Sequence, residues 1–200
     1  MTNLFDPKVQ ESDLSSKSVV GLERISEVFR VLLWQKSNET GLSPIQIQLL
    51  IFIKNHDSSL ANVSQLAREF NMKKPTISDA VKILFQKELI TKESGSDART
   101  YTILLTEKGK SMVDSLKDLG EPIKDILDEL DASEKDALFQ ALAKVIFKLN
   151  QRGLIDVQRT CFGCRFYEKS SSGHYCYFIK KPLLGNGILL DCGDFQPRES

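Results

Sequence analysis

The chain has 200 residues, of which 41% are hydrophobic, and it carries 27 basic and 27 acidic side chains, so its net charge is zero. This length suits one domain with extensions or two small domains. No apolar run approaches the roughly 18 residues of a membrane span, and the first residues lack the basic and then apolar pattern of a signal peptide. We therefore expect a cytoplasmic protein with no membrane contact.

Charge is unevenly distributed along the chain. Residues 62–110 carry nine Lys and Arg against six Asp and Glu, a net charge of +3. Residues 111–150 carry five against nine, a net charge of −4. A basic segment followed by an acidic one is typical of a DNA-facing module on a solvated helical scaffold.

The first third of the chain predicts a tail and two helices. Residues 1–18 are polar and Ser-rich, which predicts a mobile tail. Residues 19–35 have apolar side chains at helical spacing and predict a long amphipathic helix. Ser43 and Pro44 then supply an N-cap and a first-turn proline for a second helix, which is almost entirely apolar. His56 at its end is given no function, because a histidine near a helix C-terminus is more often a surface or capping residue.

Two short helical stripes follow, joined by a short connection. Residues 63–70 place apolar side chains at i, i+3, i+4 and i+7, with Asn62 as the expected N-cap. Residues 77–85 form a second stripe, and only residues 71–74 separate the two. So short a connection forces the helices to cross steeply, as in a helix-turn-helix.

A charged hairpin is predicted next. Residues 89–93 and 99–105 are strand-like and flank a turn-rich tip at residues 94–98. Two crossing helices followed by a basic hairpin indicate a winged helix-turn-helix.

The hairpin carries residues that resemble a known family. The pattern of residues 97–109 is similar to the wing signature of the multiple-antibiotic-resistance regulator (MarR) family, and its matching positions are Asp97, Arg99, Ile103, Leu105, Thr106 and Gly109. Residues 66–67 and 75–78 are also similar. The resemblance covers residues 19–150 in element order and is sharp between residues 63 and 109. The chain departs from the family at position 79, often basic but here Asp, and at position 88, often Gly but here Glu.

The resemblance implies a sequence-specific transcription regulator that binds double-stranded DNA. The recognition helix, residues 74–87, would enter the major groove, where Thr76, Ser78 and Lys82 would read base edges or anchor phosphates. Lys73 and Lys74 would contact the DNA backbone. Arg99 in the wing would reach the minor groove or grip phosphate, and Asp97 would orient Arg99. The resemblance also leaves room for a small-molecule effector.

The helices after the wing predict a dimer. Thr106 can cap a helix to about residue 119, residues 123–130 form another, and Asp131 caps a last one. The last helix has an apolar face made of Ala137, Leu138, Ala141, Leu142, Val145, Ile146 and Leu149. That face is too wide for the winged helix to cover alone, and in the resembling family such helices pair with a second subunit. We expect a homodimer.

The C-terminal segment, residues 154–200, is rich in cysteine and lies outside the resemblance. It holds all four cysteines and seven of the sixteen aromatic residues. A segment this short needs disulfides or metal to fold, and a reducing cytoplasm disfavours disulfides. The Cys-x-x-Cys pair at 161 and 164 is a usual half-site for tetrahedral metal. The predicted ligands are Cys161, Cys164, Cys176 and Cys192.

The identity of the metal is left open. Zinc and an iron–sulfur cluster both accept four thiolates, and disulfides or free thiols are a third alternative. His174 could replace one cysteine. Since the segment lies about fifty residues beyond the wing and nothing in the sequence couples the two, we expect a structural clip.

The predicted fold is therefore mainly α with a small β wing, flanked by dimerisation helices and followed by a small Cys-rich module. The expected divisions are a tail at 1–18, a MarR-like domain at 19–153 with its winged-helix core at 44–109, and the Cys-rich segment at 154–200. Two other functions fit the sequence: an iron–sulfur or thiol redox-sensing regulator, and a protein-interaction winged helix without DNA binding. The sequence contains no Gly-rich phosphate loop, no nucleophile elbow and no paired histidines on a helix, so no motif predicts an enzyme.

Overall fold

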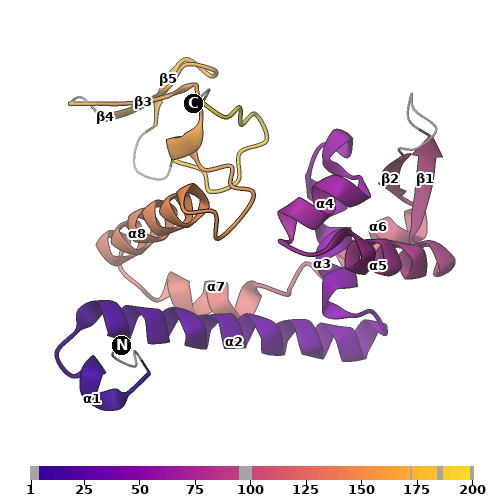
Figure 1. Cartoon of the computed structure of the whole chain (residues 1–200), viewed down its shortest axis with the longest axis horizontal. Coiled ribbons are helices and arrows are strands. Elements are labelled where there is room, and N and C mark those ends of the chain that lie inside the picture. Colours follow the sequence, from indigo (N-terminus) through magenta and orange to yellow (C-terminus); the bar gives the residue numbers. More distant parts are fainter. Residues whose placement is uncertain (1–4, 95–100, 172, 184–186, 199–200) are drawn as a thin grey trace.

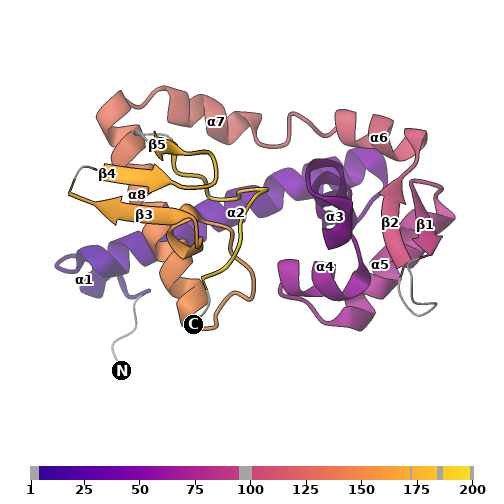
Figure 2. The ribbon, with the colours of Figure 1, turned by 90° about the horizontal axis from the view of Figure 1, so that it is seen from above.

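The computed structural model describes residues 5–94, 101–171, 173–183 and 187–198. A long N-terminal helix runs along one side of the molecule (Figure 1). The winged helix lies at one end of this helix, and the Cys-rich module lies over the last helix at the other end. Figure 2 shows the two groups of elements side by side along the long helix.

The N-terminal segment is more ordered than the sequence predicted. A short helix, α1 (Pro7–Gln10), is followed by α2 (Leu14–Thr40), which is 27 residues long. Asp13 starts α2 because its carboxylate accepts hydrogen bonds from the backbone N–H groups of Ser15 and Ser16. The sequence predicted a mobile tail at residues 1–18, but residues 7–10 and 14–18 are helical. In the second of these segments, the Asp13 cap stabilises a helix that the polar composition did not predict. Gly41, at φ 65°, ends the helix in the left-handed conformation.

The winged helix has the predicted order of elements. It consists of α3 (Pro44–Asn55), a 3-10 turn (Ser58–Leu60), α4 (Val63–Glu69), α5 (Lys74–Gln86), β1 (Ile90–Ser94) and β2 (Tyr101–Leu105). Ser43 and Asn62 cap their helices as predicted. The strands pair antiparallel, with Ile90 opposite Leu105. This confirms the winged helix-turn-helix.

One apolar core holds these elements together. Its fully buried side chains come from every helix and from the hairpin, and include Ile47, Leu49, Leu50, Leu66, Ile77, Leu84, Ile90 and Ile103. The N–H of Ile103 also donates to the carbonyl oxygen of Ala61 at 2.7 Å, which ties the wing to the start of α4. Packing on one face therefore fixes the orientation of α5, and its other face is exposed.

Two backbone positions shape the wing. Glu88, at φ 60°, is a non-glycine residue in the left-handed region between α5 and β1. Gly109 approaches the backbone so closely that an added Cβ would lie 2.0 Å from the carbonyl oxygen of Leu89. The glycine of the wing signature is therefore required by sterics.

Three helices follow the wing: α6 (Glu107–Asp114), α7 (Glu121–Asp128) and α8 (Ala132–Gln151). Thr106 caps α6 through the N–H of Gly109 at 3.0 Å, as predicted. Asp131 and Glu134 form a capping box at the start of α8. No helix of the described residues is long and apolar enough to cross a membrane.

The Cys-rich module folds around a second, smaller core. A 3-10 turn (Cys161–Gly163) leads into β3 (Tyr167–Ser170), β4 (Gly173–Cys176) and β5 (Lys181–Leu183), which form an antiparallel sheet in that order. Its buried side chains are Cys161, Cys164, Tyr167, Leu183 and Ile188, and Phe139 of α8 packs against them. The module therefore builds its own core and rests on α8.

Candidate nucleic-acid interface and cysteine pocket

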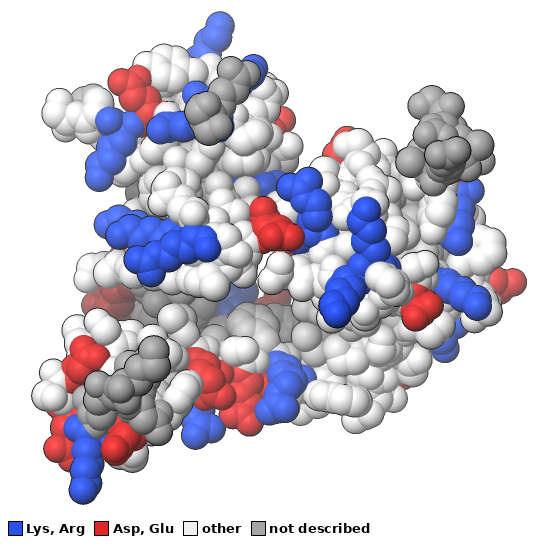
Figure 3. Space-filling model, viewed as in Figure 1, with Lys and Arg blue, Asp and Glu red and all other residues white. Residues whose placement is uncertain are grey.

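The outer face of α5 carries the predicted DNA-contacting side chains. All five described candidates are exposed: Lys73, Lys74, Thr76, Ser78 and Lys82. The opposite face is buried through Ile77, Ala80, Val81 and Leu84. Among the described residues, α5 has no side-chain hydrogen bond at its N-cap, Lys73, and both Lys73 and Lys74 at this positive end of the helix dipole are exposed. Figure 3 shows basic side chains on the surface over α4 and α5.

The wing is attached to α5 through Lys92. Its ammonium lies 4.6 Å from the ring centroid of Tyr101 and 5.2 Å from that of Phe85. These cation–π contacts join side chains of β1, β2 and α5. Asp97 and Arg99 lie outside the described residues.

The long helices expose a large amount of apolar surface. The exposed apolar side chains include Leu14, Val19, Leu22, Ile25, Val28, Phe29, Val31 and Trp34 on α2, Ile126 and Leu127 on α7, and Leu138 and Val145 on α8. Along α8 only Ala143 is fully buried. An exposed apolar surface this extensive is typical of a protein–protein contact.

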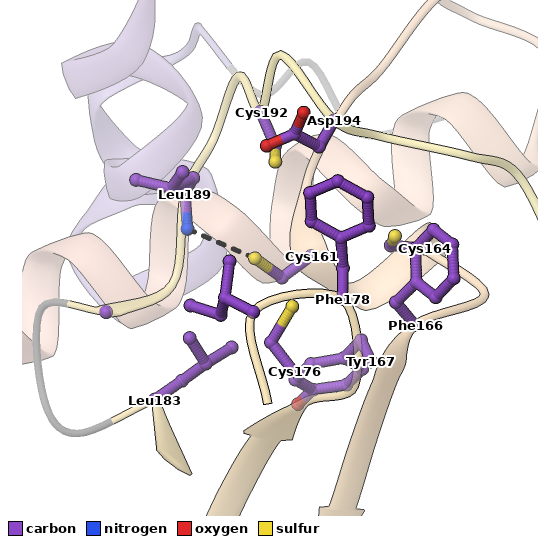
Figure 4. Close-up of a pocket in the computed structure, with 12 residues that line it drawn as sticks. Cys161, Cys164, Phe166, Tyr167, Cys176, Phe178, Leu183, Leu189, Cys192 and Asp194 are labelled. Atoms are coloured by element: carbon purple, nitrogen blue, oxygen red, sulfur yellow. Dashed lines mark hydrogen bonds between the residues drawn. The ribbon is translucent and has the colours of Figure 1, made fainter. Parts of the chain in front are cut away.

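The four cysteines come from separate parts of the module and line one pocket (Figure 4). Cys161 and Cys164 lie at the 3-10 turn, Cys176 ends β4, and Cys192 lies in the C-terminal loop. The cavity has a volume of about 100 Å³, and its walls are mostly apolar and include Phe166, Tyr167, Phe178, Leu183 and Leu189. All four cysteines are free. The fold therefore brings together residues that are up to 31 positions apart in the chain.

The pocket environment modifies the thiols. Burial raises the pKa of Cys161, although a hydrogen bond from the N–H of Leu189 to its Sγ at 3.3 Å works in the opposite direction. Burial likewise raises the pKa of Cys192. Within the described part of the chain, no three Cys, His, Asp or Glu side chains are already arranged as a metal-binding group. The structure thus shows four free cysteines lining one pocket.

His174 does not line this pocket. It lies on β4, and its Nδ1 is 2.6 Å from the hydroxyl oxygen of Tyr167. The two rings also stack with their centroids 5.7 Å apart. The histidine thus supports the sheet, whereas the sequence left open a role as a ligand.

A network of charged groups joins the Cys-rich module to the winged helix. Nη2 and Nη1 of Arg159 lie 2.6 and 3.0 Å from the two carboxylate oxygens of Glu69. Nη1 of Arg159 also lies 3.3 Å from Oδ1 of Asp191, and Oδ2 of Asp191 lies 2.6 Å from Nε2 of His56. We call these four residues the Arg159 network. No sequence pattern indicated this network, apart from the positions of Arg159 and Asp191 close to predicted ligands.

Aromatic contacts support the network. The Arg159 guanidinium lies 5.6 Å from the ring centroid of Phe52, and the His56 ring stacks on the same phenylalanine at 3.9 Å. Burial alone would lower the pKa of Arg159, but the hydrogen bond and charge of Glu69, followed by those of Asp191, raise it above its ordinary value. Arg159 therefore remains charged in a site where its side chain is only 9% exposed.

Comparison with known proteins identifies the winged helix. Residues 40–100 match the model of the MarR family. The structure of a MarR/EmrR family transcriptional regulator from Acinetobacter sp. ADP1 superposes with a TM-score of 0.58 and 23% identity, over 70% of this chain and 99% of that one. The structure of a MarR transcriptional regulator from Methanosarcina mazei Go1 superposes with a TM-score of 0.56 and 21% identity, over 68% of this chain and 98% of that one.

A DNA-bound structure is among the similar ones. The complex of MepR from S. aureus with DNA superposes with a TM-score of 0.56 and 21% identity, over 64% of this chain and 94% of MepR. No curated protein matches the chain. The proteins from Acinetobacter sp. ADP1 and Methanosarcina mazei Go1, and MepR, are each described as transcription regulators. The chain therefore has the fold of the MarR regulators, and its segment 40–100 matches the model of that family.

Proposed function

We propose that this protein is a MarR-type transcription regulator that binds specific double-stranded DNA as a homodimer. The observation that carries the proposal is the exposed outer face of α5, with its two N-terminal lysines and two hydroxyls on a helix whose opposite face is buried. A recognition helix reads base edges in the major groove with the residues near its N-terminus. The similar MepR was crystallised with DNA, which supports the same role here.

We assign different tasks to the exposed residues of α5. Lys73 and Lys74, beside the positive end of the helix, contact the phosphate backbone and set the position on the duplex. Thr76 and Ser78 lie closer to the groove and read base edges, and Lys82 reaches a base or a phosphate one turn later. Arg99 of the wing contacts the adjacent minor groove, with Asp97 orienting it.

The dimer is assigned to α2, α7 and α8. Their exposed apolar side chains would be covered by the same helices of a second copy, which would place the two winged helices on two half-sites. Half-sites of a dimeric helix-turn-helix protein are separated by about one helical turn of DNA or a multiple of it. The expected operator is therefore a palindrome.

The cysteine pocket is proposed to hold a metal ion on Cys161, Cys164, Cys176 and Cys192. Zinc fits the donor set, since four thiolates surround it tetrahedrally in structural sites. Closing on the ion requires the four side chains to adjust from the positions that now line the cavity. Elemental analysis tests this directly: about one zinc per chain supports the site, whereas iron with a brown colour after anaerobic purification would assign an iron–sulfur cluster. Less than about half an equivalent of both metals would refute it.

The experiment for DNA binding is selection of duplexes from a random pool by the full-length protein, followed by affinity measurements at several salt concentrations. A palindromic consensus bound far more tightly than random DNA is expected, with affinity that falls steeply with salt. Equal affinity for all duplexes, or no retention at low salt, would refute sequence-specific binding and favour a protein-interaction role.

A further inference from the structure

Two residues beside the cysteines reach out of the module to the winged helix. Arg159 precedes Cys161 by two positions, and Asp191 directly precedes Cys192. The segments that carry them are joined, because Arg159 and Asp191 form a parallel β-bridge and the N–H of Cys192 donates to the carbonyl oxygen of Arg159 at 3.2 Å. The backbone that would position two thiolates therefore also positions both charged side chains.

The contact with the winged helix is buried and directional. The side chains of Arg159 and Glu69 are 9% and 15% exposed, and they meet through two parallel hydrogen bonds. A bidentate ion pair of this kind fixes the relative orientation of the two side chains as well as their distance. Separating it would leave charges unpaired in a largely dry site, which is strongly unfavourable. The module and the winged helix are thus held in one relative arrangement while the network is intact.

The network acts at the elements that support the recognition helix. Glu69 is the last residue of α4, and the turn that follows it leads directly into α5. His56 follows the end of α3. The amide of Asn71 in the turn also donates to the carbonyl oxygen of Leu154 at 3.5 Å. The side chains of α5 that we assign to DNA remain exposed in this docked arrangement.

We propose that metal in the cysteine pocket controls DNA affinity through the Arg159 network. Binding of the ion fixes the positions of Cys161 and Cys192, and therefore those of Arg159 and Asp191. These two side chains then hold α3, α4 and the turn before α5 in the conformation that binds DNA. Without the ion the module is less ordered, and so are α4 and the turn. DNA binding must then also order α4 and the turn, and this entropic cost lowers the affinity for DNA. This inference rests on the proposed function, both for DNA and for metal. It replaces the expectation of an uncoupled clip.

The test compares zinc-loaded and zinc-stripped full-length protein, kept reduced, on a duplex selected by the wild type. We expect zinc removal to weaken binding about tenfold in the wild type, a usual size for coupling between two sites. In Glu69→Gln, which keeps the shape of the side chain but removes its charge, the change should fall below about twofold. Glu107→Gln is the matched control, because Glu107 pairs with Lys110 on α6 and lies outside the network. It should retain the wild-type response.

A second measurement does not depend on DNA. Hydrogen exchange of the amides in residues 66–72 should become at least about fivefold faster on zinc removal in the wild type and in Glu107→Gln. In Glu69→Gln the exchange should be fast with and without zinc. Unchanged exchange in the wild type would contradict the proposal.

The outcomes separate this inference from the function on which it rests. Protein that binds zinc and a specific duplex, with equal affinity for that duplex before and after zinc removal, overturns the coupling alone. A full response in Glu69→Gln also overturns it, because the network would then not carry the effect. Tighter DNA binding after zinc removal overturns the assigned direction. Failure to bind zinc or a specific duplex overturns the proposed function and the inference together.

Discussion

Arg159 and Glu69 lie 90 residues apart in the chain, yet the guanidinium of one contacts both carboxylate oxygens of the other, at 2.6 and 3.0 Å. The pair joins the end of α4 to the Cys-rich module. It gives the module a defined position on the winged helix, where the sequence alone offered two unconnected parts.

The first prediction distinguishes the α5 residues that contact the DNA backbone from those that recognise bases. Lys74→Ala should weaken binding to every duplex alike and reduce the salt slope by about one, because one phosphate contact is lost. Ser78→Ala should change the preference among operator variants. Affinities of both variants for a panel of duplexes at several salt concentrations check this. Lys87→Ala, at the far end of the helix, is the control and should leave the preference unchanged. A uniform loss for Ser78→Ala would remove Ser78 from base reading.

The second prediction concerns the dimer. Val145 on α8 is 41% exposed in the single chain, and we place it in the subunit interface. Val145→Glu would bury a charge there without a partner, which costs several kcal/mol (on the order of 3 or more). Sedimentation should show monomers, and operator affinity should collapse. Lys144→Glu introduces the same carboxylate at the neighbouring exposed position and should remain a dimer. A Val145→Glu dimer would refute this placement.

The third prediction identifies the metal ligands. Replacing any one of Cys161, Cys164, Cys176 or Cys192 by Ser should release most of the metal, because a structural ion supplies on the order of 10 kcal/mol through its complete ligand set. Metal content and protease sensitivity of the module would measure the loss. His174→Ala is the matched test of the alternative ligand. It should keep the metal, since His174 contacts Tyr167. Loss of metal from His174→Ala would place the histidine in the site.

The fourth prediction uses the backbone at the end of α5. Glu88 has a φ of 60°, and its side chain is 82% exposed and lies 3.6 Å from the Lys108 ammonium. Glycine relieves left-handed strain worth about 1 kcal/mol, and the exposed ion pair contributes less than that. Glu88→Gly should therefore raise the free energy of unfolding in denaturant titrations. Lys87→Gly, at φ −80°, should lower it by roughly 0.5–1 kcal/mol. A destabilised Glu88→Gly would show that the ion pair outweighs the strain.

The fifth prediction concerns the close approach at Gly109. A Cβ there would lie 2.0 Å from the carbonyl oxygen of Leu89, and backbone cannot move away as a flexible side chain could. Gly109→Ala should destabilise the protein by at least about 2 kcal/mol and disturb the wing. Gly120→Ala is the matched control, because an added Cβ there meets nothing within 4 Å. Thermal unfolding of both variants checks the difference, and equal stability would show that the backbone at Leu89 can move away from α6 without cost.

Local sequence determined most of the winged helix. Apolar spacing of 3.6 residues located α3, α4, α5 and α8. The capping residues Ser43, Asn62, Thr106 and Asp131 located the beginnings of α3, α4, α6 and α8, because these signals act within one or two turns. The cysteine spacing likewise indicated one thiol-rich module before any geometry was known.

Only the tertiary structure showed what lies between these parts. Asp13 extended α2 into a segment whose composition predicted disorder, since a cap and a long helix outweigh local polarity. His56, given no function from its position, was brought against Asp191 by a contact spanning 135 residues. Such contacts depend on how separate elements pack, and a pair of charges far apart in the chain leaves no periodic pattern to read. The sequence thus determined the elements and their chemistry, whereas packing decided which of them meet.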